Sequence, residues 1–163
     1  AWQTRGDCDM VQRLICKDVL SLIRNAQKVD ILCIGAPNIT GDAVGPVTGY
    51  RLKRMSLPKH VNVIGCINDP VHNRNLRDKL QLLRDDALVI CVDAAIGEEY
   101  PLIKLRTGPM QPGAAISDKL PMVGDVSVLC MMGDNLQSII DCEPSLMYHV
   151  SREVAKLLTV YLI

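Results

Sequence analysis

The sequence contains no phenylalanine, and only one tryptophan and four tyrosines among its 163 residues. Proteins that bind single-stranded nucleic acid stack its bases on aromatic side chains, so this composition argues against that class. The formal net charge is zero and no long Lys/Arg run occurs, which removes the electrostatic footprint of nucleic-acid and membrane-surface binders. We therefore expect neither nucleic acid nor a membrane as a partner.

Long apolar runs are also missing. The stretches ALVICV (87–92) and VSVLCMM (126–132) are far shorter than the roughly 18 residues needed to cross a bilayer. The opening AWQTRGDCDM lacks a charged segment followed by an apolar one, so no secretory signal is expected. The seven cysteines form no CxxC pair and several fall within apolar runs, which favours a cytoplasmic protein with its thiols packed in the core.

The residues that are present alternate between helix-like and strand-like segments. Hydrophobic residues make up 48% of the chain, enough for a single domain over residues 1–163 with a substantial core. The apolar spacing predicts the first elements in this order: helix 9–27, strand 30–35, helix 43–56, strand 61–66, helix 75–84 and strand 87–93.

The pattern changes after Asp93. Only AAIGEE separates this residue from a strand over 100–106, and a parallel crossover needs about a dozen residues or more, so this strand is predicted to run antiparallel. A strand over 125–132 and a helix beginning at Pro144 complete the chain. The fold class predicted is a three-layer α/β/α sandwich, with a five-stranded, mostly parallel sheet containing one antiparallel strand.

Ligands of such sheets bind beyond the carboxyl ends of the strands, near a switch in strand order. The loops expected at that edge contribute these polar residues: Asn38, Thr40, Asp42, Asn68, Asp69, His72, Asn73, Asp93, Asp134 and Asn135. Asp42, Asp93 and His72 are far apart in the sequence but would meet at this edge.

Each candidate also has a purely structural interpretation. Asp42 precedes a predicted helix and can cap it by accepting backbone N–H bonds. Asp93 follows six apolar residues, where an unpaired carboxylate is costly to bury. The sequence supports a functional role and a structural role for Asp93 equally. His72 alone reads as a hydrogen-bonding loop histidine, and Asp69, before Pro70, as a turn residue.

Common nucleotide and nucleophile motifs are not supported. GAPNITG does not match GxGxxG, and GDAVGP lacks GK[ST], so neither a dinucleotide fingerprint nor a phosphate-binding P-loop is predicted. Cys66 ends a predicted strand without a nucleophile signature, so packing is favoured over a Cys-His hydrolase.

Four segments in order, IGAPNITGDAVGP, GCINDPVHNRNL, VDAAIG and GPMQPGAAISDKLPMVGDVSV, resemble the YyaC family of sporulation proteins. YyaC proteins are similar to the spore germination protease and, more distantly, to the hydrogenase maturation endopeptidases. The resemblance implies a phosphorylase/hydrolase-like fold. It also implies an active site formed by an acidic residue after strand one and an aspartate ending strand three, which here are Asp42 and Asp93.

The leading hypothesis is an aspartic-type peptidase in which Asp42 and Asp93 activate water, with no cofactor required. Backbone N–H groups after Gly41 are candidates to stabilise the oxyanion. The resemblance implies a peptide or protein substrate, such as small acid-soluble spore proteins, and a cytoplasmic setting in the forespore. Candidates for binding substrate or metal are His72, Asp69, Thr40, Asn38 and Asn135.

Two alternatives stay open. In the first, the chain is a metal-dependent endopeptidase of the hydrogenase-maturation type, with a divalent metal held by Asp42, Asp93 and His72, although the histidine of those enzymes lies in a different segment. In the second, it is a non-catalytic sporulation protein that binds or regulates; the segment MMGDNLQSIIDCEP, which departs from the YyaC pattern, motivates this reading. A homo-oligomer is also left open.

Overall fold

The computed structural model describes residues 2–3, 11–112 and 120–163. The strands are β1 Trp2–Gln3, β2 Gln12–Ile15, β3 Val29–Cys33, β4 Val61–Ile64, β5 Leu88–Ile96, β6 Leu102–Thr107 and β7 Val126–Gly133. The helices are α1 Lys17–Asn25, α2 Val44–Lys53, α3 Leu76–Lys79, α4 Leu136–Ile140 and α5 Pro144–Leu162, with a 3-10 turn, η1, at Leu80–Leu82.

The strands pair in one mixed sheet in the order β1-β2-β6-β7-β5-β3-β4. Strands β4, β3, β5 and β7 are parallel to their neighbours in this group, whereas β6 is antiparallel to β7. The antiparallel direction predicted for the strand after Asp93 is therefore confirmed. The expectation of five strands is wrong, because β1 and β2 extend the sheet beyond β6 to seven strands.

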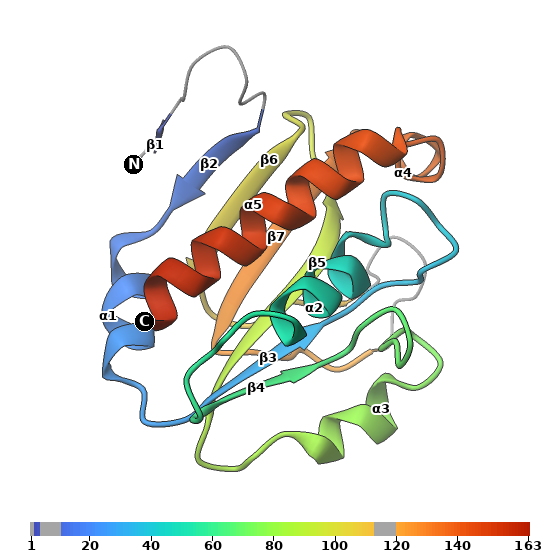
Figure 1. Ribbon diagram of the computed structural model, residues 1–163. Coiled ribbons are helices and arrows are strands. Elements are labelled where there is room, and N and C mark those ends of the chain that lie inside the picture. The colour runs from blue at the N-terminus through green and yellow to red at the C-terminus, as the bar shows by residue number, and fades with distance from the viewer. Residues whose placement is uncertain (1, 4–10, 113–119) are drawn as a thin grey trace.

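Apolar side chains cover both faces of the sheet, as expected for parallel strands buried on two sides. On one face, Ile31 and Val92 pack with Val154 and other residues of α5. On the opposite face, Leu32 and Cys91 belong to a smaller cluster that includes Leu76 of α3. Figure 1 shows α2 and α5 in front of the sheet. The predicted α/β/α layering is confirmed, with the α3 layer much thinner than the α2/α5 layer.

Helix α2 lies close to the sheet because two of its residues lack a side chain. A Cβ atom on Gly45 would lie 2.0 Å from the carbonyl oxygen of Ile34, and one on Gly49 would lie 1.9 Å from that of Gly65. Larger residues at these positions would push α2 away from the strand ends. The two glycines thus set the position of the loop that enters α2.

The helix predicted over residues 9–27 is partly wrong. Residues 9 and 10 lie outside the described part of the chain, Gln12–Ile15 forms β2, and the helix α1 begins only at Lys17. Strand β2 pairs in parallel with Leu102–Leu105 of β6. Pairing with the exposed edge of β6 satisfies backbone groups there and overrides a helical preference that is weak for any short segment.

Other elements also differ from the predictions. Strand β5 continues past Asp93 to Ile96, and the helix predicted over 75–84 is the short α3 followed by η1. Helix α4 lies in a segment for which no element was predicted. Of the residues that the structure describes, none forms a helix long and apolar enough to cross a membrane.

Candidate active site

A pocket lies beyond the ends of β3 and β5, two neighbouring strands at which the strand order reverses. The chain passes from β3 to β4 on one side of β3, then returns to place β5 on the other side. Strand β3 ends at Cys33, opposite Val92, while β5 continues through Asp93. Such a switch point leaves a crevice beyond the strand ends, and here a pocket of about 340 Å³ occupies it.

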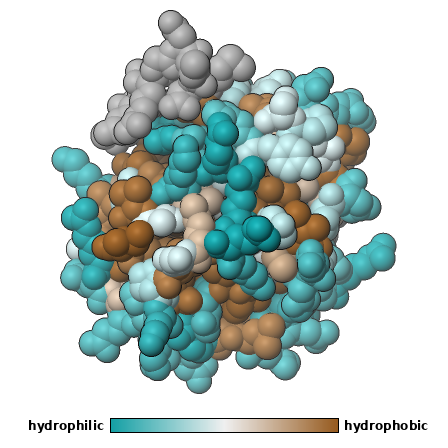
Figure 2. All heavy atoms as spheres, in the orientation of Figure 1, coloured by the Kyte–Doolittle hydropathy of each residue, from teal (hydrophilic) through white to brown (hydrophobic). Residues whose placement is uncertain are grey.

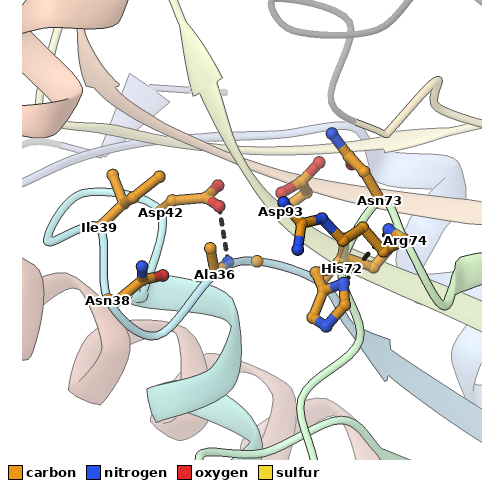
Figure 3. Close-up of a pocket in the computed structure, with 10 residues that line it drawn as sticks. Ala36, Asn38, Ile39, Asp42, His72, Asn73, Arg74 and Asp93 are labelled. Carbon is orange, nitrogen blue, oxygen red and sulfur yellow. Dashed lines mark hydrogen bonds between the residues drawn. The ribbon is translucent and has the colours of Figure 1, made fainter.

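Three segments line this pocket. The loop between β3 and α2 contributes Asn38 and Asp42, the loop after β4 contributes His72 and Arg74, and β5 contributes Asp93, with further lining residues Ile34, Gly35, Ala36, Ile39 and Asn73. Figure 3 shows the carboxylates of Asp42 and Asp93 pointing toward each other across the pocket. The structure therefore brings together four of the seven candidate catalytic or binding residues, Asn38, Asp42, His72 and Asp93.

Asp42 closes the loop that carries it. Its Oδ2 accepts a hydrogen bond of 2.6 Å from the backbone N–H of Ala36. Helix α2 begins at Val44 with Ala43 as its N-cap residue and no side-chain capping bond. The interpretation of Asp42 as a helix cap is therefore wrong. Its carboxylate instead connects the start of the loop to its end through a hydrogen bond.

The backbone around Gly35 makes this closure possible. Gly35 has a φ of +153°, and a Cβ atom there would lie 2.0 Å from the carbonyl oxygen of Asp42. The N–H of Gly35 donates to Val71 O over 2.8 Å, which ties the loop after β3 to the loop after β4. The two loops that carry Asp42 and His72 are thus held together by backbone contacts.

The environment of Asp42 favours the protonated carboxyl group. Burial raises the pKa of Asp42 above its usual 3.8, and the hydrogen bond from Ala36 opposes that rise only in part. Removing a carboxylate from water penalises its charged form. Asp42 is thus the lining residue that the surroundings prepare to hold a proton.

This raised pKa predicts a pH dependence of stability. Above pH 3.8, the usual pKa, Asp42 ionises in the unfolded chain but keeps its proton in the folded one, so the folded state binds more protons. The free energy of unfolding then falls as the pH rises, until Asp42 also ionises in the folded state. Relative to an Asp42→Asn variant, the wild type should lose stability over this window in urea titrations from about pH 4 to about pH 7. A difference between the two proteins that does not change with pH would contradict the assignment.

Asp93 is a buried group on a central strand. Asp93 is only 5% exposed and pairs with Leu129 of β7 in the sheet. Burial raises the pKa of the Cys91 and Cys130 thiols above their ordinary range, and the nearby charge of Asp93 adds to this effect. These raised pKa values keep both thiols protonated.

His72 and Arg74 extend the site on the side of Asp93, as Figure 3 shows. The Nδ1 atom of His72 accepts a 3.2 Å hydrogen bond from the backbone N–H of Arg74, and the backbone N–H of His72 donates to Asn75 Oδ1 over 2.8 Å. Neutral imidazole has one donor and one acceptor nitrogen, so this contact leaves the proton on Nε2. His72 is therefore oriented as a hydrogen-bond donor at Nε2.

Three predicted site residues lie outside the lining. Asp69 is an exposed residue whose carboxylate pairs with Lys79 Nζ over 2.6 Å. Asn135 caps α4, where its Oδ1 accepts from the N–H of Ser138 over 2.9 Å. Thr40 belongs to the same loop as Asp42 but is not among the lining residues.

Arg74 was missed by the sequence interpretation. It lies two residues after His72 in the segment PVHNR, and its guanidinium group brings a positive charge to a pocket with two carboxylates. The sequence did hold one signal for Arg74: a cation two residues after a histidine that was predicted to lie at the carboxyl edge of the sheet. Loop conformation decided whether that side chain would turn toward the pocket.

The residues do not form the metal site required by the endopeptidase alternative. Across residues 2–3, 11–112 and 120–163, no group of three or more His, Cys, Asp or Glu side chains is arranged to hold a metal ion. The acceptor Nδ1 of His72 is already engaged by the backbone.

Comparison with known proteins agrees with the fold and with the family resemblance. The chain is 38% identical over 103 residues to the uncharacterized protein YyaC of Bacillus subtilis (strain 168). That match covers 60% of this chain and 50% of the relative, so the aligned region spans about half of the relative's length.

Among solved structures, the fold is similar to a [NiFe] hydrogenase maturation protease, HycI, from Thermococcus kodakarensis KOD1. The TM-score is 0.66 at 19% identity, covering 90% of this chain and 99% of that one. A hydrogenase 2 maturation peptidase from Thaumarchaeota archaeon SCGC_AB-539-E09 matches with a TM-score of 0.49 at 16% identity, covering 80% of this chain and 95% of that one.

The remaining comparison is with family profiles. Residues 6–161 match the family described as protein of unknown function DUF1256. This match includes every segment that lines the pocket and nearly the whole chain. The resemblance to YyaC is thus confirmed, and the chain belongs to the DUF1256 family.

Proposed function

We propose that this chain is a peptide-bond hydrolase of the aspartic type, in which Asp42 and Asp93 activate water. The observation that carries the proposal is that two carboxylates from different segments line one pocket at the switch point of the sheet. Two facing carboxylates with different surroundings separate in pKa, so that one holds a proton while the other is ionised. This is the arrangement that acid–base hydrolysis requires.

The proposal gives each carboxylate a different role. Asp93, as the ionised base, would take a proton from water while the water oxygen attacks the carbonyl carbon of the peptide. Asp42, whose pKa is raised by burial, would donate its proton to the amide nitrogen as the C–N bond breaks. The products are a carboxylic acid and an amine, and proton exchange with water restores both groups.

Oxyanion stabilisation would come from the loop after β4 rather than from the start of α2. Of the N–H groups after Gly41, that of Ala43 donates to Ile39 O over 2.8 Å and that of Val44 donates to Gly41 O over 3.5 Å. These donors are already used, which argues against our sequence-based expectation for this segment. Arg74 and the Nε2–H of His72 are donors that line the pocket on the Asp93 side.

The substrate class proposed is a peptide or protein segment, and the family resemblance is what suggests a role in sporulation or germination. The structurally similar HycI is itself described as a maturation protease, which is consistent with peptide chemistry on this fold. The non-catalytic alternative was motivated by the segment around Asn135. That residue caps α4 outside the pocket lining, so it lends this alternative no support.

The test is cleavage of an unbiased peptide library by the purified protein, read by mass spectrometry. We expect cleavage products with the wild type and none with Asp93→Asn. Treating the wild type with a chelator should leave its cleavage products unchanged. Products that disappear on chelation and return with Zn²⁺, Ni²⁺ or Mn²⁺ would instead support the metal-dependent alternative. Complete absence of products from folded wild type, with and without these metals, would contradict hydrolysis of either kind.

A further inference from the structure

A second concave surface lies between α2 and α5, apart from the pocket. This groove has a volume of about 580 Å³, larger than that of the pocket. The two helices pack against each other and form its walls, and Ile67 of the loop after β4 closes one side. None of the residues proposed for hydrolysis lines it.

The walls of the groove concentrate positive charge. Arg51 and Arg54 come from the end of α2, and Arg152 and Lys156 come from α5. The lining residues include no Asp or Glu. Since the whole chain has no formal net charge, four cations around one groove form a strong local excess.

This charge is not cancelled by neighbouring carboxylates. Arg51 Nε donates to Ser151 Oγ over 3.1 Å, the Arg54 guanidinium lies 5.4 Å from the ring centre of Tyr50, and Arg152 contacts His149 Nδ1 at 2.9 Å. Among the residues that the structure describes, none of these three arginines forms an ion pair with a carboxylate.

The fourth cation is only weakly compensated. Lys156 lies 3.9 Å from Glu153, a carboxylate that also pairs with Arg13. The positive charges of the groove are therefore available to interact with a bound ligand.

Apolar and aromatic surface accompanies the cations. Tyr50, Tyr148 and Ile67 all line the groove and are 39%, 51% and 42% exposed. Figure 2, which views the molecule from the side of α2 and α5, shows strongly hydrophilic side chains lying next to apolar ones on this face. Exposed aromatics beside arginines are the composition enriched in protein-binding surfaces.

The spacing along α5 indicates the size of the occupant. Tyr148, Arg152 and Lys156 recur every four residues, so they lie along one face of the helix and span about 12 Å. That distance corresponds to roughly four residues of an extended peptide, or to about two turns of a helix laid into the groove.

We propose that the groove between α2 and α5 binds a short acidic peptide segment of a partner protein. Arginine forks are matched to carboxylates, and Tyr148 and Ile67 provide contacts for one or two apolar side chains between them. Single-stranded nucleic acid is disfavoured because the chain as a whole has no formal net charge. The binding site does not depend on hydrolysis in the pocket.

The test is fluorescence anisotropy with a fluorescein-labelled peptide made of Glu and Leu. The comparison peptide has Gln in place of every Glu. We expect the acidic peptide to bind, the Gln peptide to bind at least about tenfold more weakly, and added salt to weaken the acidic complex. The double variant Arg54→Gln/Arg152→Gln should lose about tenfold or more in affinity.

A matched control removes two exposed cations from elsewhere, as Arg24→Gln/Lys59→Gln, and should keep the affinity of wild type. Thermal unfolding by circular dichroism shows whether both double variants fold. Equal loss in the two double variants, or equal binding of both peptides, would overturn the proposal.

Two other occupants would also overturn it. A labelled single-stranded oligonucleotide that binds the groove more tightly than the acidic peptide would assign it to nucleic acid. A wild-type dimer in sedimentation that becomes monomeric in Arg54→Gln/Arg152→Gln would assign it to a second copy of this chain.

Discussion

Replacing Asp42 with asparagine is expected to reduce peptide hydrolysis by about 100- to 10,000-fold, the usual contribution of a general acid or base. The amide oxygen of Asn can still accept the N–H of Ala36, which Asp42 now binds over 2.6 Å. The loop should therefore keep its shape, while the side chain can no longer hold and donate a proton. Steady-state kinetics on a peptide identified in the library measures the effect.

Two further variants separate chemistry from loop structure. Asp42→Ala removes the acceptor as well as the proton, so it should also lower thermal stability. Asp69→Asn alters an exposed carboxylate that pairs with Lys79 and should keep the turnover of wild type. A folded Asp42→Asn variant with nearly unchanged turnover would show that Asp42 only closes the loop.

Replacing Asp30 with alanine is expected to destabilise the fold by up to about 3–5 kcal/mol, the cost of breaking a fully buried ion pair. The Arg84 side chain is 28% exposed, which lowers the cost of leaving its charge unpaired. Asp30 is fully buried on β3. Its carboxylate accepts from the backbone N–H of Arg84 over 2.7 Å and from Arg84 Nε over 2.9 Å. The same guanidinium donates to the carbonyl oxygens of Val29 and His60, each at 3.0 Å, so the loss would loosen the starts of β3 and β4.

The chain offers a matched control for this prediction. Asp86 pairs with Lys28 at 2.6 Å, but both side chains are largely exposed, and exposed ion pairs contribute little to stability. Urea unfolding should therefore show a large loss for Asp30→Ala and almost none for Asp86→Ala. Similar losses in the two variants would mean that the buried pair contributes no more than a surface one.

The sequence was a reliable guide wherever local pattern and burial agree. The continuous apolar runs before Asp93 and around Val128 indicated central strands, and the short connection after Asp93 required an antiparallel neighbour. The pattern was a poor guide to residues 12–15, which have helical apolar spacing but form β2. There the exposed edge of β6, a partner distant in sequence, decided the structure.

The same distinction between local pattern and tertiary contacts applies to the candidate site. Residue order alone placed Asp42 and Asp93 at one edge of a parallel sheet, because parallel strands direct their carboxyl ends to the same side. Only the tertiary structure decided that Asp42 binds Ala36 instead of capping α2, that Asn135 caps α4, and that Arg74 lines the pocket. These outcomes depend on which backbone groups the folded loops bring within hydrogen-bonding distance, and no local pattern in the sequence encodes that.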